Sequence, residues 1–371
     1  MKRPLRATLV VIAGLLVAAI AAFHHWRAQR QQAFHEVPAG GVADIVWVAV
    51  RQRDQHLFVR GLDRSKPILL FLPGGPGESF APLAPVFTGE LERDFVVAHI
   101  EMGGVGMSPD YASTPSFDDL VADTGTIIDA LRERYGRDAV YLVGHSFGSA
   151  LALRAAQAWP EKVLAVATVG QTVDWRAGNR LAHAELVRRA TAERNRRALD
   201  ELAAIPADLV KPRDPTLVDF NAVQVLRRWQ EHYGIMNIFR KHTAKVHWVE
   251  YLTAPGHSLR QSCRLVYRGP CKLVGDSPNW WYNWNLALRG IVAFDAARDV
   301  PHLAVPYLAI VGDDDWVTPT SLILDYAATL QAPAKRVVHL AGAQHYAFLD
   351  RPREFQAAVR LLLAPQDWPR D

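Results

Sequence analysis

The chain has 371 residues, of which half are hydrophobic and 22% are charged, so it is long enough to bury a large core and has the composition of an ordinary globular protein. Its formal net charge of +4 comes from the N-terminus, because five basic residues precede the first acid and the remainder is near neutral. These five are Lys2, Arg3, Arg6, Arg27 and Arg30. No basic stripe indicates a nucleic-acid partner.

Residues 7–23 form an uninterrupted uncharged run behind basic residues. As a helix this run would reach roughly 25 Å, slightly short of the bilayer's hydrocarbon core of about 30 Å. Two interpretations of residues 1–27 stay open: a cleaved signal peptide, for which Ala19-Ile20-Ala21 offers a cleavage site, and the uncleaved membrane anchor that we favour. Both predict a catalytic part outside the cytoplasm, in the cell envelope, with a polar linker at residues 28–40.

Short apolar runs alternate with helical patterns from residue 41 onward. In residues 116–135, apolar residues recur at helical spacing, and Ser116 and Asp119 form a possible capping pair. Continuous apolar strands between helices favour an α/β fold with a mostly parallel sheet covered by helices on both faces. The predicted strands are Ile68–Leu72, Phe95–Ile100, Val140–Val143, Val163–Val169, Tyr307–Val311 and Arg336–Leu340.

The alternation of strands and helices is interrupted once. Residues 176–295 are helix-rich and then irregular, and they hold five of the 11 tryptophans. We therefore expect one core, formed by residues 41–175 and 296–371, with an inserted, mainly helical cap. Within the cap, Cys263 and Cys271 form either a disulfide or two unpaired thiols. Zinc is not expected, because no second ligand pair has the required spacing.

The stretch "YLVGHSFGSALAL" (141–153) places a serine between glycines where a strand pattern meets a helix pattern. This is the layout of a nucleophile elbow, in which the serine side chain stands on a sharp turn and its neighbours must be small. Gly144, Gly148 and Ser149 meet that requirement. The following helix directs its N-terminus at the serine and favours negative charge there. Ser146 is thus the candidate nucleophile.

A serine nucleophile needs a base, and the base needs an orienting acid. Downstream, "GDDD" and "GAQH" each follow a predicted strand. The order Ser, Asp, His is that of the α/β-hydrolases, whose acid usually falls three residues after such a glycine, so we assign Asp315 as acid and His345 as base. Asp313 and Asp314 are the alternatives, or solvated loop carboxylates. His339 lies inside a predicted strand, where we expect a packed residue.

Acyl transfer also requires two N–H donors where the tetrahedral oxygen forms. The stretch "FLPGGPGES" (71–79) follows the first strong strand, and its glycines let the backbone approach a substrate closely. The backbone amides of Gly75 and Phe147 are the predicted oxyanion hole. Because these groups supply nucleophile, base and electrostatics, we expect neither a metal nor an organic cofactor.

Residues 44–364 resemble the proline iminopeptidase branch of the α/β-hydrolases. Gly74-Gly75-Pro76-Gly77 matches that branch, although Pro73 replaces its usual histidine, and residues 101–108 keep two glycines and a serine of a second motif. The resemblance implies release of N-terminal residues from small peptides or amides. It also implies cap carboxylates that hold the substrate's amino group, for which the candidates are Glu231 and Glu250, unless both lie on solvated helix faces.

Other functions remain open. Trp229 and Trp281 of the cap are candidates for the wall of an apolar pocket that suits a proline ring or a short acyl chain. A carboxylesterase acting on small apolar esters is therefore the alternative. A catalytically dead, membrane-tethered binding protein is the alternative of another class. An epoxide hydrolase or dehalogenase is excluded, because those enzymes need a carboxylate where Ser146 stands.

Overall fold

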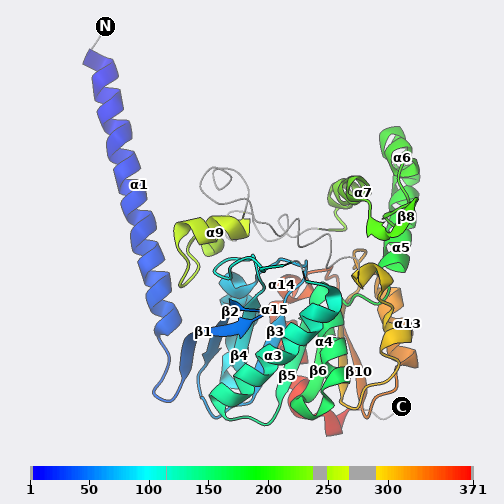
Figure 1. Ribbon diagram of the computed structural model, residues 1–371. Helices are drawn as coiled ribbons and strands as arrows, with labels where there is room; N and C mark the ends of the chain where they lie inside the picture. Colours follow the sequence, from blue (N-terminus) through cyan, green and yellow to red (C-terminus); the bar gives the residue numbers. More distant parts are fainter. Residues whose placement is uncertain (1–2, 114, 237–248, 267–289, 369–371) are drawn as a thin grey trace.

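The computed structural model describes residues 3–113, 115–236, 249–266 and 290–368 (Figure 1). Its centre is an eight-stranded sheet with the order β1-β2-β4-β3-β5-β6-β9-β10. The strands of this sheet are β1 (Val42–Val50), β2 (Arg53–Gly61), β3 (Ile68–Leu72), β4 (Val96–Glu101), β5 (Val140–His145), β6 (Val163–Val169), β9 (Tyr307–Gly312) and β10 (Lys335–Leu340).

The predicted fold class is confirmed. All six predicted strands are present, with boundaries that differ by at most two residues. The pairs from β4 through β10 are parallel, whereas β2 is antiparallel to both β1 and β4. Parallel strands bring their carboxyl ends to one edge of the sheet, so the loops after β3, β5, β6, β9 and β10 meet there.

The β1–β2 hairpin was not among the predicted strands. Its two-residue turn consists of Arg51 and Gln52, which both have positive φ, at 51° and 62°. Such a turn is usually signalled by asparagine or glycine, because those residues adopt positive φ most readily. An Arg-Gln pair gives no such signal in the sequence.

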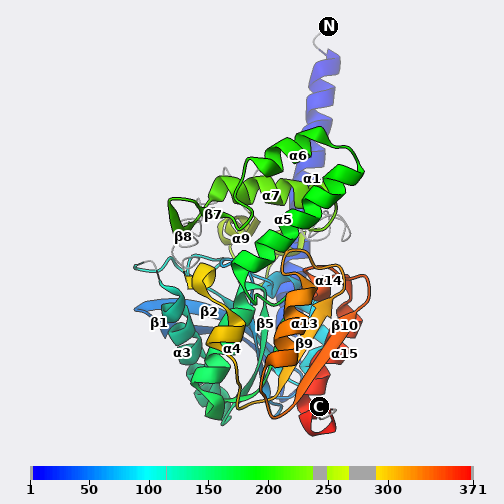
Figure 2. The ribbon, with the colours of Figure 1, turned by 90° about the vertical axis from the view of Figure 1, so that its right-hand side faces the viewer.

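Helices cover both faces of the sheet (Figures 1 and 2). One apolar cluster holds residues of α3 (Phe117–Tyr135), α4 (Phe147–Ala158) and α13 (Thr320–Thr329), and a second holds residues of α2 (Ala84–Phe87), α14 (Ala347–Asp350) and α15 (Pro352–Arg360). The predicted capping pair is confirmed: the Ser116 side chain accepts from the Asp119 amide, and the Asp119 carboxylate accepts from the Ser116 amide.

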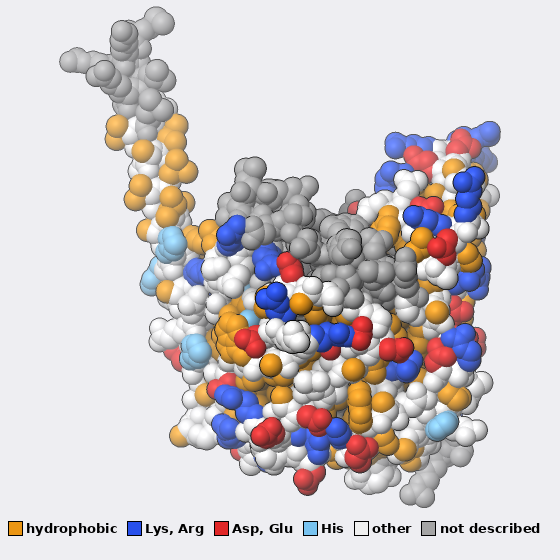
Figure 3. Space-filling view, viewed as in Figure 1, with side chains coloured by type: hydrophobic (Ala, Val, Ile, Leu, Met, Phe, Trp, Pro, Cys, Tyr) orange, Lys and Arg blue, Asp and Glu red, His pale blue; other side chains and the backbone are white. Residues whose placement is uncertain are grey.

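The N-terminal helix α1 runs from Arg3 to His35 (Figure 1). It continues through most of residues 28–40, where the sequence indicated a linker. The chain stays helical there because it contacts the core: Phe34 packs edge-on against Phe58, with ring centroids 6.2 Å apart. From Val10 to His35 the helix is long and apolar enough to cross a membrane, with a mean hydropathy of 1.6. Figure 3 shows its apolar side chains exposed to solvent.

The cap lies on the side of the sheet where the strands end in the site loops (Figure 1). An isolated antiparallel bridge between Asp174 and Asp295 joins the chain just before the cap to the cap's last residue. The same two side chains cap the helices that follow them, α5 and α12. The cap elements are α5 (Trp175–Ala192), α6 (Arg196–Ala203), β7 (Val210–Lys211), β8 (Asp214–Val218), α7 (Phe220–His232) and α9 (Leu259–Val266); the core resumes with α12 (Ala296–Asp299).

The cap also contains the two cysteine positions. Cys263, in α9, is disulfide-bonded. Cys271, its predicted partner, lies outside the described residues, as does Trp281.

Candidate active site

Ser146 stands on a sharp turn between β5 and α4 and has φ 51° and ψ −121°, a conformation that non-glycine residues rarely adopt. Positions 144 and 148, two residues before and after it, have no space for a side chain. A Cβ at position 148 would lie 2.3 Å from the Leu72 carbonyl oxygen, and a Cβ at position 144 would lie 2.5 Å from the Gly148 oxygen. The two glycines are therefore required by the backbone that surrounds them.

Hydrogen bonds hold this turn in place. The Ser146 amide donates to the Val169 carbonyl at 3.1 Å, which ties the turn to the end of β6. The Ser149 hydroxyl donates to the Ser146 carbonyl and accepts from the Thr172 amide at 3.0 Å. The strained serine is thus fixed by the next strand and its following loop, so its side chain is held toward the site.

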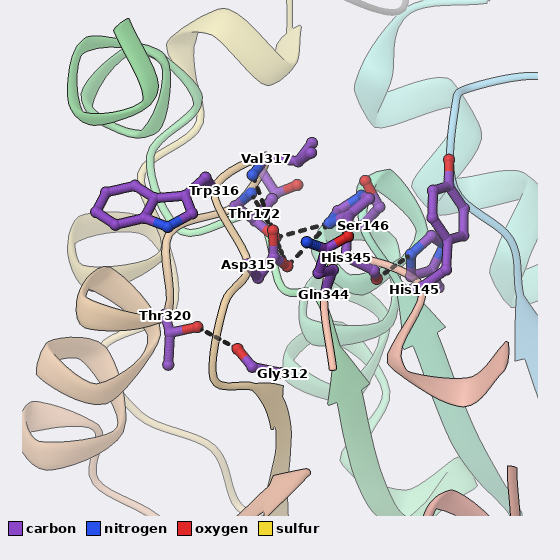
Figure 4. Close-up of polar contacts among 12 residues, drawn as sticks. His145, Ser146, Thr172, Gly312, Asp315, Trp316, Val317, Thr320, Gln344 and His345 are labelled. Carbon is purple, nitrogen blue, oxygen red and sulfur yellow. Dashed lines mark hydrogen bonds and ion pairs between the residues drawn. The ribbon is translucent and has the colours of Figure 1, made fainter. Parts of the chain in front are cut away.

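Asp315 and His345 meet at the carboxyl edge of the sheet, after β9 and β10 (Figure 4). The His345 Nδ1 lies 2.9 Å from Asp315 Oδ2, and both side chains are buried. Asp315 Oδ1 accepts from the amides of Val317 and Thr318, at 2.8 and 3.0 Å, and the Thr318 hydroxyl donates to Oδ2 at 2.8 Å. The carboxylate is therefore held rigidly against the imidazole.

The neighbouring candidates lie elsewhere. Asp313 pairs with His339 at 2.9 Å, and both side chains are about half exposed. His339 is therefore not the packed residue that the sequence suggested, because β10 is the edge strand of the sheet and its flank is open to solvent. Asp314 accepts from the indole N–H of Trp316 at 3.0 Å.

The imidazole of His345 lies beside Ser146 (Figure 4). Since Nδ1–H donates to Asp315, the Nε2 lone pair is left to accept a proton. The ring also packs against Gly170, which has φ +52°, and a Cβ there would lie 3.0 Å from His345 Nδ1. Gly170 and Thr318 are supporting residues that were not singled out from the sequence.

His145, the residue before the serine, holds the backbone of His345. Its Nε2–H donates to the His345 carbonyl at 3.1 Å. Burial, and then the nearby His345, hold the pKa of His145 well below its ordinary value, so the ring is neutral. His145 therefore fixes the His345 backbone without adding a charge to the site.

The loop after β3, residues 73–79, is here called the oxyanion loop. Gly75 has φ +109°, and a Cβ there would lie 2.7 Å from the Gly77 amide nitrogen, so only glycine fits. Helix α4 begins at Phe147, so the Phe147 amide is among the helix N-terminal N–H groups that have no intrahelical acceptor. Phe147 directly follows Ser146 in the chain, and Gly75 directly follows Gly74, whose Cβ position lies 3.1 Å from Ser146 Cβ.

Glu78, in the same loop, was not singled out from the sequence. A Cβ at Gly74 would lie 2.7 Å from Glu78 Oε2 and 3.1 Å from Ser146 Cβ, so the carboxylate and the serine flank one small space. Oε1 accepts from the Tyr346 hydroxyl at 2.9 Å, and Oε2 is enclosed without a hydrogen-bond partner, 4.0 Å from His145 Nδ1. Burial raises the pKa of this carboxyl, against the opposing effects of Tyr346, His345 and Arg227. Its only sequence signal is its position after Gly-Gly-Pro-Gly.

Three of the cap candidates lie among the described residues, and their surroundings differ. Glu231 is exposed on α7. Trp229 is buried within the cap's own packing, and its indole N–H donates to Glu201 at 2.9 Å. Glu250 is half-buried. Among the described residues, no cluster of three or more His, Cys, Asp or Glu could hold a metal ion.

Comparisons with known proteins agree with this architecture. The family model described as "alpha/beta hydrolase fold" matches residues 67–352. The probable aminopeptidase YbaC of Bacillus subtilis (strain 168) is 25% identical over 317 residues, which are 83% of this chain and 92% of that protein. Among solved structures, a proline iminopeptidase-related protein from Thermus thermophilus aligns with a TM-score of 0.58 at 20% identity, over 87% of this chain and 98% of that one.

A carboxylesterase from Bacillus subtilis is also similar, with a TM-score of 0.56 at 14% identity, over 93% of this chain and 98% of that one. The chain therefore belongs to the α/β-hydrolase family and is a hydrolase. The resemblance to the proline iminopeptidase branch is supported by the first two relatives. The structural likenesses by themselves show the fold.

Proposed function

We propose that the protein is a serine hydrolase that acts through an acyl-enzyme. Ser146 Oγ attacks the substrate carbonyl and passes its proton to His345 Nε2. The imidazolium returns that proton to the leaving amine or alkoxide, and water then repeats the sequence to release the acyl group. The contact of 2.9 Å between His345 Nδ1 and Asp315 Oδ2, beside a serine on a strained turn, is the observation that carries the proposal.

The amides of Gly75 and Phe147 are the proposed donors to the tetrahedral oxygen. Phe147 directly follows Ser146, Gly75 directly follows the glycine whose Cβ position lies 3.1 Å from Ser146 Cβ, and both donors are backbone groups. Preorganised donors of this kind stabilise the charge that develops in the transition state.

For the substrate we propose peptides or amides with a free N-terminus, from which the first residue is released. Glu78 supports this choice, because its carboxylate shares a small space with Ser146 and has one oxygen without a partner. An α-ammonium lies one carbon away from the carbonyl under attack, so its counter-ion must be close to the nucleophile. Glu78 fits that position better than Glu231, which is exposed on the cap.

The test is a comparison of Glu78→Gln with Glu231→Gln. Activity is measured on proline p-nitroanilide and on a p-nitrophenyl ester without an amino group. We expect Glu78→Gln to lower the amide-to-ester ratio of kcat/KM by roughly ten- to a hundredfold, because an ammonium in a partly buried site loses its charged partner. Glu231→Gln should leave the ratio within about twofold. An unchanged ratio in both variants would favour the esterase alternative.

That alternative, a carboxylesterase acting on small apolar esters, is favoured by one observation. The cap carboxylate expected from the resemblance, Glu231, is exposed to solvent. The similar carboxylesterase fold agrees with this alternative equally well. An esterase would hydrolyse the ester in the wild-type chain and leave proline p-nitroanilide uncleaved, and the same pair of assays would reveal it.

We also propose that α1 anchors the protein in a membrane with the catalytic part outside the cytoplasm, in the cell envelope. Support comes from the exposed apolar surface of α1 and from the basic residues Lys2, Arg3 and Arg6, which precede the apolar run in the sequence. The disulfide at Cys263 suits an oxidising compartment. Protease treatment of intact spheroplasts should digest the domain. Protection that persists until lysis would refute this topology.

A further inference from the structure

The last turns of α1 are joined to both the core and the cap. Arg60, in β2, donates to the carbonyls of Ala33 (2.9 Å) and Phe34 and pairs with Glu92. Two turns earlier in the helix, Arg27 donates to the carbonyls of Leu252 (3.0 Å) and His257. Helix α1 therefore contacts the core through Ala33 and Phe34 and the cap through Arg27.

Residues 251–257, here called the docking segment, lie between α1 and the core. Their backbone packs closely: Gly256 has φ +73°, and a Cβ there would lie 2.4 Å from Ile45 Cδ1 and 3.3 Å from Met107 Sδ. The His257 ring stacks on Phe58 at a centroid distance of 5.2 Å, and Phe58 is the residue that Phe34 of α1 contacts. The docking segment is thus fixed against the core by α1 on its outer side.

On its inner side the docking segment contacts the oxyanion loop once directly and once through Glu101 of β4. The Tyr251 hydroxyl donates to the Ser79 carbonyl at 3.0 Å. His257 Nε2 lies 2.9 Å from Glu101 Oε1, and the same oxygen accepts from the Ser79 hydroxyl at 2.9 Å. Both the carbonyl and the hydroxyl of Ser79 are therefore held through this segment, four residues after Gly75.

The contact between Glu101 and His257 is a buried ion pair. Burial is the largest effect on each group and disfavours both charges. The His257 charge and the hydrogen bonds from His257, Met107 and Ser79 together still lower the pKa of Glu101, and the Glu101 charge and the hydrogen bonds to Glu101 and Pro255 together raise the pKa of His257. Removal of one partner of such a pair leaves an uncompensated buried charge, so the pair strongly favours the docked arrangement. The docking segment cannot move away from the core without breaking it.

We propose that α1 contributes to catalysis, because Arg27 positions the oxyanion loop through the docking segment. Arg27 touches neither substrate nor the reacting atoms, and it is a positioning residue. Arg27 donates hydrogen bonds to the carbonyls of Leu252 and His257 and so fixes the docking segment. The docking segment in turn fixes Ser79, which lies in the same loop as the Gly75 amide. The inference does not depend on whether the substrate is a peptide or an ester.

The proposal is tested in the full-length chain in detergent, with Arg27→Met and with Tyr251→Phe, which removes only the hydroxyl contact with Ser79. We expect each variant to lower kcat by roughly tenfold with KM changed by less than about threefold, since a misplaced oxyanion donor weakens transition-state binding more than substrate binding. The affinity of a boronic acid that forms a tetrahedral adduct at Ser146 should fall by a similar factor. Arg27→Lys, which keeps one donor group, should recover part of the loss.

The matched control is Arg298→Met, since Arg298 also donates to a backbone carbonyl, that of Ala293, away from the oxyanion loop. Its kcat should equal that of the wild type. The double variant Arg27→Met/Tyr251→Phe should lose little more than either single variant, because both act through one set of contacts. Three results would overturn the proposal: an unchanged kcat in Tyr251→Phe, fully additive losses in the double variant, or an equal loss of kcat in the Arg298→Met control. If Arg27→Met fails to fold, Tyr251→Phe and the control still decide the question.

Discussion

Replacement of Asp315 by asparagine tests how the carboxylate controls His345. The two oxygens of Asp315 have different partners: Oδ1 accepts from the amides of Val317 and Thr318, and Oδ2 accepts from the Thr318 hydroxyl and His345 Nδ1. An asparagine must keep its oxygen toward the two backbone donors, because an NH₂ group there would oppose two N–H groups. Its NH₂ group therefore takes the place of Oδ2 and donates to His345 Nδ1.

An imidazole that accepts at Nδ1 carries its proton on Nε2 and cannot take the proton of Ser146. The wrong tautomer lowers kcat about 10⁴-fold in Ser-His-Asp enzymes, which corresponds to about 5 kcal/mol of transition-state stabilisation. We expect a loss of this order for Asp315→Asn, with KM nearly unchanged. The fold should survive, because the asparagine keeps both backbone hydrogen bonds and the Thr318 hydroxyl can rotate to avoid the new donor.

The assay is steady-state hydrolysis of a p-nitrophenyl ester at pH 7 to 8, with thermal unfolding measured in parallel. Asp313→Asn is the matched control, since Asp313 lies two residues earlier and pairs with the half-exposed His339. It should retain wild-type kcat. Activity of Asp315→Asn within tenfold of the wild type, in a protein with native Tm, would refute the assigned role of this carboxylate.

Two further predictions concern stability. Gly148→Ala should lower the free energy of unfolding by several kcal/mol in denaturant titrations, because the new Cβ would lie 2.3 and 2.5 Å from the Leu72 and Pro73 carbonyl oxygens, which are fixed backbone atoms. Asp123 is buried, which raises its pKa from 3.8 to about 7 despite the Arg51 charge. The folded state therefore holds this proton more tightly than the unfolded chain, so stability should fall as the pH rises from about 4 to about 7, and thermal unfolding of Asp123→Asn should show a smaller decline.

Much of the core was predictable because its signals are local. The central strands are continuous apolar runs, since both faces of a parallel sheet are covered by helices. The turn at Ser146 is recognisable because backbone crowding excludes all but glycine at positions 144 and 148. The contact between His345 and Asp315 follows from strand order, because residues after adjacent parallel strands meet at one edge.

The remaining features depend on contacts between distant segments, which no local pattern reveals. Glu78 faces Ser146 only because the oxyanion loop turns back over the end of β3; in the sequence it resembles any solvated turn residue. Residues 28–35 are polar and read as a linker, yet they are helical because α1 is held by Arg60 and Phe58. Glu231 lies two residues after the buried Trp229, but side chains two residues apart on a helix do not share a face, and Glu231 is exposed to solvent.

The central claim, that Ser146 forms an acyl-enzyme with His345 as its base, is tested most directly by labelling the full-length protein with a fluorophosphonate. Peptide mass spectrometry should locate one adduct, on Ser146, and the labelling rate should fall by at least about a thousandfold in His345→Ala, because the hydroxyl is a weak nucleophile without its base. An adduct on another residue, or undiminished labelling of Ser146 in His345→Ala, would contradict the mechanism.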